Sequence, residues 1–206
     1  MKTLLQIRSS IYSDGGQSSR LADRFVAQWR KANPGGQVIV RDLAREPVPH
    51  IDAARFGAFV AKPEQRTAEQ LDVVAYSDAL IEELERADVI VLAVPMYNFG
   101  IPSTLKAYFD HVARAGVTFK YTDKGPVGLL TGKKAYVFAA RGGRYAGTPL
   151  DSQTPYLRAF LGFVGIADVE FVYAEGLAIS EASRNKALDE AHAQIADLIE
   201  PELEAA

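Results

Sequence analysis

The stretch Val-Ile-Val-Leu-Ala-Val-Pro-Met-Tyr-Asn-Phe-Gly, residues 89–100, decides the fold. Its first six residues are all apolar and rich in β-branched side chains, and the run is too short for a typical helix. This pattern is expected of a strand that is buried on both faces of a parallel sheet. A proline, a thioether, two aromatic rings and an amide follow at 95–99. The stretch therefore predicts a central strand that ends in an unusual loop.

Four similar apolar runs lie on either side of this strand, at residues 3–7, 37–40, 135–139 and 169–173. Helical spacing separates them, and Leu21, Phe25 and Trp29 recur every four residues. A second helix is predicted where Thr67 and Gln70 match a capping box before an apolar face, and a third after Ser180. The second helix should bury Leu71, Val74, Ile81 and Leu84, and the third Leu188, Ala191, Ile195 and Leu198.

Strands that alternate with helices predict an α/β protein with helices on both faces of a parallel sheet. Five such strands suit a doubly wound sheet of order 2-1-3-4-5, whose ligand crevice lies at the carboxyl ends of the first and third strands. The long connection at 44–66 contains three prolines and is expected to hold a short helix around 53–60. The loops after the first, third and fourth strands should then carry the functional residues.

Length and composition restrict the remaining classes. A chain of 206 residues fits one domain spanning residues 1–206, and its net charge of −3 gives no positive potential for nucleic acid. The absence of cysteine excludes thiolate chemistry and disulfides, and it suits the cytoplasm. No uncharged stretch approaches the length of about 20 residues that spans a bilayer, so no membrane partner is expected.

The loop after the first strand combines hydroxyl side chains and glycines just before a helix. Ser10 is followed by Gly16, Gln17 and Ser18, and backbone N–H groups at a helix start favour an anion such as phosphate. The alternative is that Ser18 or Ser19 only caps the helix. The turn lacks G-x-G-x-x-G, and residues 128–133 do not match a P-loop.

Two further loops are candidates for the same crevice. Aromatic and thioether side chains at 96–99 suit a flat, partly polar ligand, although Met96 and Phe99 could instead plug the core. Gly142 and Gly143 after the fourth strand allow close backbone approach, although a tight turn alone also explains them. The three histidines show no metal-ligand spacing, so no metal site is predicted, and His111 and His192 are expected on helix surfaces.

These residues resemble the FMN-dependent NADH azoreductases, a flavodoxin-like family that includes quinone-reducing members. The resemblance covers nearly the whole chain. It is carried by Ser9-Ser10, P-M-Y-N-F at 95–99, V-A-R-A-G-V-T-F at 112–119, G-P-V-G-L-L-T-G-K-K at 125–134, R-G-G at 141–143 and T-P-Y-L-x-x-F-L-G-F at 154–163. It implies bound FMN, NADH or NADPH as electron donor, a quinone or azo compound as acceptor, and a homodimer.

Residue by residue, the resemblance implies two sets of contacts. The cofactor would be held by Ser10, Gly16, Gln17, Ser18, Met96, Tyr97, Asn98, Phe99, Ala140, Arg141, Gly142 and Gly143. The acceptor pocket would be shaped by Tyr121, Tyr145 and Phe163, with a partner subunit completing it. This chain departs from the family in having Gly16 and Ala140 where serine is frequent, and Tyr145 where histidine is frequent.

The implied activity is two-electron transfer in a ping-pong cycle in which donor and acceptor use one pocket in turn, with no side-chain nucleophile. Two other functions remain open. One is an electron-transfer flavodoxin, which the weak acidity of the chain disfavours because such carriers dock through strongly acidic surfaces. The other is an interaction module that has kept the fold without a cofactor. Donor preference would depend on a few side chains of the long loop, such as Arg55, Lys62 or Arg66.

Overall fold

The computed structural model describes residues 1–204 and contains a five-stranded parallel sheet of order β2-β1-β3-β6-β7. All five predicted strands are present, and their order is the predicted 2-1-3-4-5 once the strands of this sheet are counted alone. The sheet strands are β1 Thr3–Arg8, β2 Gln37–Asp42, β3 Val89–Pro95, β6 Lys134–Ala140 and β7 Asp168–Ala174. The helices are α1 Gln17–Ala32, α2 Ala53–Val60, α3 Ala68–Arg86, α4 Ser103–Val112, α5 Gln153–Val164 and α6 Glu181–Glu204, with short turns η1 Ser13–Gly15 and η2 Pro63–Gln65.

A small antiparallel hairpin lies outside this sheet and was not predicted. It consists of β4 Phe119–Thr122 and β5 Gly125–Gly128. Both strands have only four residues, and the second contains two glycines and a proline, which are poor strand formers. The hairpin accounts for the numbering of the last two sheet strands as β6 and β7.

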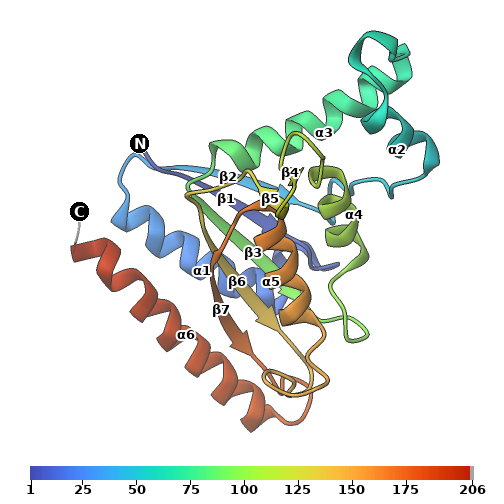
Figure 1. Cartoon of the computed structure of the whole chain (residues 1–206). Coiled ribbons are helices and arrows are strands. Elements are labelled where there is room, and N and C mark those ends of the chain that lie inside the picture. Colours follow the sequence, from blue (N-terminus) through green and yellow to red (C-terminus); the bar gives the residue numbers. More distant parts are fainter. Residues whose placement is uncertain (205–206) are drawn as a thin grey trace.

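Helices cover both faces of the sheet, as predicted (Figure 1). On one face α1 and α6 pack together, burying Phe25 and Trp29 of α1 and Ile195 of α6 against the central strands. The other face is covered by α3, α4 and α5. Strand β3 is buried along its whole length, which explains its continuous apolar sequence.

The predicted helix starts are also confirmed. Thr67 and Gln70 form both hydrogen bonds of the capping box at α3, and the Ser180 hydroxyl accepts a hydrogen bond from the Ser183 N–H at the start of α6. One predicted core residue of α3 is wrong, because Leu71 is 51% exposed while Val74, Ile81 and Leu84 of the same helix are buried.

The expectation that His111 lies on a helix surface is also wrong. Its side chain is fully buried, because α4 packs against α3 and Phe59 of α2 lies beside the imidazole ring. Tyr76 and Phe59 meet the imidazole ring edge to face at 5.8 and 5.9 Å. His192 on α6 is half-buried. Within residues 1–204, no helix combines the length and the apolar character needed to cross a membrane.

Candidate functional site

An open cleft of about 350 Å³ lies where the carboxyl ends of β1, β3 and β6 meet. This is the position that the strand order predicts for a ligand. Its walls come from the three loops selected from the sequence and from one residue after β7. The lining residues are Ser10, Tyr12, Gly15, Gly16, Gln17, Pro95, Met96, Tyr97, Ala140, Arg141, Gly142 and Leu177.

The first wall is the N-terminus of α1. The N–H groups in the first turn of any helix lack intrahelical acceptors. Here the N-cap residue is Gly16, which has no side chain to accept from them. The hydroxyls of Ser18 and Ser19 are buried and have no hydrogen-bond partner among the described residues. Neither serine caps the helix, which excludes the capping alternative. Unsatisfied donors at a positive helix end are suited to bind a phosphate.

Ser10 and Gly16 approach each other closely in this wall. A Cβ atom on Gly16 would overlap the hydroxyl and the Cβ of Ser10. Gly16 has an ordinary φ of −71°, so close approach and not backbone conformation requires glycine here. The Ile11 N–H donates to the Tyr97 hydroxyl at 3.3 Å, which links the loop after β1 to the loop after β3.

The second wall is a tight turn after β3. Tyr97 and Gly100 exchange two backbone hydrogen bonds of 3.0 Å, and the two residues between them have positive φ, 50° for Asn98 and 65° for Phe99. Non-glycine residues in this conformation carry backbone strain, which is frequent at binding sites. Asn98 and Phe99 are exposed and Met96 is half-buried, so Phe99 does not plug the core.

The third wall is the turn after β6. The carbonyl groups of Gly142 and Gly143 accept hydrogen bonds from Ala178 and Gly176, at 3.0 and 2.7 Å. The N–H groups of both glycines make no hydrogen bond within the part of the chain that is described. The Tyr145 ring lies against this turn, since a Cβ atom on Gly143 would lie 2.5 Å from its hydroxyl oxygen.

Arg141 contributes its backbone to the cleft, whereas its side chain is buried and forms hydrogen bonds and ion pairs inside the protein. The guanidinium is fully buried and donates to Gln153 at 3.1 Å, Glu175 at 3.0 Å and Thr154 at 2.9 Å, and it lies 3.1 Å from Asp151. The side chain therefore ties the end of β6 to the start of α5 and the end of β7. The sequence does not show that this arginine faces inward.

Asp151 belongs to the same buried cluster. Burial alone would raise the pKa of its carboxyl, but hydrogen bonds from Thr154 and the Arg141 guanidinium together hold the pKa below its usual value. The carboxylate is thus the stable form at neutral pH, and it partly balances the buried positive charge of Arg141.

The residues expected around the acceptor are not all together in one chain. Tyr145 stands beside the cleft and meets Phe99 edge to face at 5.4 Å. Tyr121 lies on β4 and lines a different groove, of about 550 Å³, together with Phe56 and Phe59 of α2. Phe163 packs on Phe119 at 4.2 Å.

That second groove lies toward the opposite end of the sheet from the cleft. The segment after β5 is joined to the C-terminal end of α5, where the Leu130 N–H donates to the Val164 carbonyl at 2.9 Å. This end of α5 leads into the amino end of β7, whereas the cleft lies at the carboxyl ends of the strands. Figure 1 shows the β4–β5 hairpin near the amino ends of the central strands.

Sequence reasoning missed Tyr12, Gly15, Pro95 and Leu177 as cleft-lining residues. The first three stand within one or two residues of predicted positions, so only the extent of each loop was underestimated. Leu177 belongs to the loop after β7, which the sequence did not indicate as part of the site. The crevice rule selects the first and third strands, and nothing in the sequence of that loop marks a ligand contact.

The geometry fits a phosphate at the α1 end and a flat ring between the turns after β3 and β6. A model of the flavodoxin-like fold matches residues 1–199. The chain is 58% identical to an FMN-dependent NADH:quinone oxidoreductase of Cellvibrio japonicus over all of both chains, and 57% identical to one of Burkholderia lata over 95% of this chain and 99% of that protein. The crystal structure of an FMN-dependent NADH-azoreductase from Bacillus anthracis in complex with FMN is 27% identical, with a TM-score of 0.88 over 97% of this chain and 98% of that one.

Proposed function

The chain belongs to the flavodoxin-like fold family, and from this premise we propose that it is an FMN-dependent NADH:quinone oxidoreductase that also reduces azo compounds. The observation that supports this most directly is the cleft floor at α1. Gly16 and Gln17 at the start of α1 line the cleft, and Ser18 and Ser19 behind them have buried hydroxyls without a partner among the described residues, so this turn offers donors that a phosphate would satisfy.

We assign each wall of the cleft a separate task. The first turn of α1, with Ser10 beside it, holds the phosphate. Met96 and the strained 97–100 turn form the wall along the ring. The free N–H groups of Gly142 and Gly143 are placed to donate hydrogen bonds to the polar edge of the ring and to stabilise negative charge there.

When bound, FMN supplies the two-electron chemistry, and the protein supplies orientation and the electrostatic environment. The open side of the cleft then receives donor and acceptor in turn. The protein's own contribution to the rate would then be to hold each substrate in a fixed orientation on that side. No side-chain nucleophile is required. We assign NADH as the donor, following the names of the relatives, with NADPH as the alternative to be measured.

A homodimer completes the acceptor pocket in this proposal. Tyr121 and Phe163 were expected at that pocket, but Tyr121 lines a separate groove in the single chain. Phe56, Val60 and Tyr121 are 58%, 66% and 74% exposed around that groove, an apolar surface that a second subunit would cover. Tyr121 and Phe163 of one subunit would then serve the cleft of the other.

The proposal also includes one domain over residues 1–206 and a cytoplasmic location, which the absence of cysteine favours. The direct test is the absorbance spectrum of the purified protein, followed by oxidation of NADH and of NADPH with a benzoquinone and with an azo dye. The expected result is a yellow protein that oxidises NADH with both acceptors. A protein that stays colourless after incubation with FMN would point to the interaction module. A flavoprotein that NADH does not reduce would point to the electron carrier.

Replacing Ser18 separates the ligand role of the hydroxyl from a structural one. Ser18→Ala removes a buried hydroxyl that has no partner in the described part of the chain, so the cofactor-free protein should keep its stability while the dissociation constant for FMN rises about tenfold. Fluorescence quenching of FMN and urea denaturation measure the two effects. Ser103→Ala, in the first turn of α4 and not among the residues that line the cleft, is the control. A loss of stability without a change in FMN affinity would contradict the assignment.

Tyr121→Ala tests the contribution of the partner subunit. The variant should bind FMN normally, because Tyr121 does not line the cleft of its own chain, yet its kcat/KM for the quinone should fall about tenfold. Sedimentation should show dimers of the unaltered protein. Mixed dimers of Tyr121→Ala with Ser18→Ala subunits should show more activity than either parent. A monomer with full activity would overturn the shared pocket.

A further inference from the structure

Glu175 is the first residue after β7, and its carboxylate makes an unusual number of contacts with one loop. It accepts hydrogen bonds from the backbone N–H groups of Tyr145 at 2.9 Å and Ala146 at 3.0 Å. It also accepts a hydrogen bond from Nη1 of Arg141 at 3.0 Å. One side chain therefore holds both the start and the end of the segment that contains Gly142 and Gly143.

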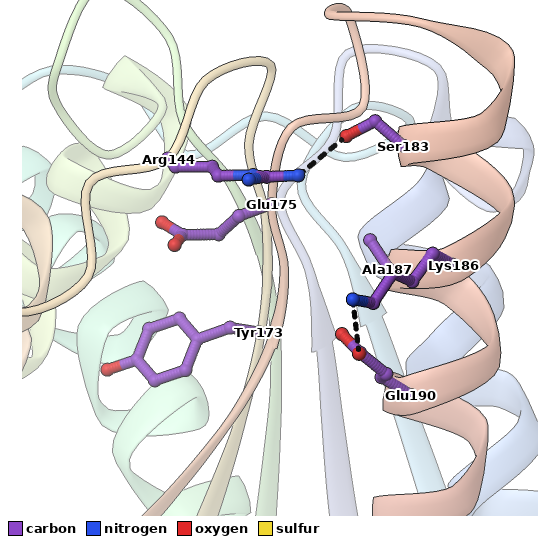
Figure 2. Close-up of a pocket in the computed structure, with 7 residues that line it drawn as sticks. All are labelled: Arg144, Tyr173, Glu175, Ser183, Lys186, Ala187 and Glu190. Atoms are coloured by element: carbon purple, nitrogen blue, oxygen red, sulfur yellow. Dashed lines mark hydrogen bonds and ion pairs between the residues drawn. The ribbon is translucent and has the colours of Figure 1, made fainter.

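The surroundings of Glu175 show that this loop is its main partner. Figure 2 shows a polar cleft of about 300 Å³ between β7 and α6, with the Glu175 carboxylate pointing away from the α6 side chains. The Arg144 guanidinium donates a hydrogen bond to the Ser183 hydroxyl at 3.2 Å, and Lys186 forms an ion pair with Glu190 of the same helix at 3.7 Å. The exposed charges of the cleft thus have partners other than Glu175.

The residues that follow Glu175 act on the same segment from the other side. The N–H groups of 176–178 donate to the carbonyls of Gly143, Arg141 and Gly142, at 2.7, 3.1 and 3.0 Å. Gly176 makes this possible with a φ of 72°, a conformation that glycine adopts without strain. Because the carbonyls are held on this side, the N–H groups of Gly142 and Gly143 are left without partners among the described residues, and Gly142 lines the cleft.

We infer that Glu175 is a positioning residue, which fixes the Gly142-Gly143 turn through Arg141 and the amides of Tyr145 and Ala146 so that two N–H donors are presented to the ligand. The identity of that ligand as FMN rests on the proposed function. Glu175 itself does not line the ligand cleft at the carboxyl ends of β1, β3 and β6. It acts by ordering the Gly142-Gly143 turn before the ligand binds. Binding then does not have to order the turn, and the entropic cost of binding is smaller.

Hydrogen exchange on the cofactor-free protein tests the ordering directly. In Glu175→Ala, the amides of Tyr145 and Ala146 should exchange about tenfold faster or more, because bonds to a charged acceptor are lost, while the rest of the chain is unchanged. Glu175→Gln keeps an oxygen acceptor and should recover most of the protection. Glu170→Ala is the matched control, since Glu170 lies on β7 itself and is likewise ion-paired, at 2.7 Å to Lys134.

FMN titration then connects the order of the turn to binding. The dissociation constant for FMN should rise about tenfold in Glu175→Ala, much less in Glu175→Gln, and not in Glu170→Ala. The midpoint potential of the bound flavin should become more negative in Glu175→Ala, because fewer fixed donors stabilise the reduced ring. If the alanine variant does not fold, Glu175→Asp makes the same comparison, since its shorter side chain cannot reach Arg141 and both amides together.

Unchanged exchange at Tyr145 and Ala146 in Glu175→Ala would overturn the inference. A uniform acceleration across all amides, with an equal loss of thermal stability, would overturn it as well, because Glu175 would then be a general structural residue. Failure of the unaltered protein to bind FMN would reject the proposed function alone. The exchange measurements would still decide whether Glu175 orders the turn.

Discussion

Gly16 shows how closely the residues in the first wall of the cleft pack against one another. The hydroxyl of Ser10 fills the space that a side chain at position 16 would need. With no side chain at position 16, this wall of the cleft depends on backbone N–H groups and on Ser10. The absence of a side chain at position 16 allows the loop after β1 to fold tightly onto α1.

Gly16→Ala should weaken FMN binding, because the new Cβ displaces Ser10 from the cleft wall. We expect the dissociation constant to rise about tenfold, equivalent to about 1.4 kcal/mol. Fluorescence quenching measures it. Gly57→Ala is the control, because a Cβ at that position of α2 meets no atom within 4 Å. An unchanged dissociation constant would show that Ser10 can move aside without consequence for the ligand.

At the same scale, the sequence identifies the cleft better than it assigns each side chain. Ser10, Gly16, Gln17, Met96, Tyr97 and Gly142 could be chosen because strand order brings three loop ends to one edge. It could not be predicted that Arg141 turns inward, because the choice between a ligand and a buried ion pair depends on Asp151, before α5, and on Glu175, after β7.

At the scale of elements, the five sheet strands were predictable because burial on both faces leaves continuous apolar runs. The short helix α2 was found at its predicted bounds. The β4–β5 hairpin was not, because its strands are stabilised by contacts with α5 that have no local pattern. Leu71 was placed in the core by periodicity, but the start of α3 has no layer against it that buries this position.

Close backbone packing joins the hairpin to α5, and Gly128 is the point of contact. A Cβ atom on Gly128 would overlap the backbone of Val164 and Gly165, so neither element could keep its place. Gly128→Ala should lower the free energy of unfolding by about 2 kcal/mol, as overpacking does. It should also disturb Phe119 against Phe163 and so lower activity with quinone more than affinity for FMN.

Urea denaturation and FMN titration of the same samples make this comparison. Gly132→Ala is the control, because that position has open space around it and only the strain of a φ of 73°. An equal effect of the two substitutions would mean that backbone conformation, and not the contact with α5, explains the glycine at position 128.

At the scale of the whole molecule, the layers on the second face of the sheet meet at a buried histidine. Burial, the first cause, lowers the pKa of His111, and the nearby Arg55 lowers it further, whereas the hydrogen bond to the Ala107 carbonyl and the charge of Asp110 oppose the shift. Its Nε2 has no partner in the described part of the chain. Protonation in place would leave a positive charge between Phe59 of α2 and Tyr76 of α3.

The sign of the resulting pH dependence follows from linkage. An unfolded chain protonates His111 near pH 6.5, whereas the folded chain does so only at lower pH. Stability should therefore be full above about pH 7, fall as the pH drops through 6.5, and level off below the folded-state pKa. His111→Phe keeps an aromatic ring between α2 and α3 and should flatten this dependence between pH 5 and 8, apart from a smaller slope from His192, whose pKa is also lowered by burial. Urea denaturation at several pH values measures the slopes, with His50→Gln in the exposed connection as control. If the His111→Phe slope equals that of the unaltered protein, the packing of α2, α3 and α4 does not restrict this proton.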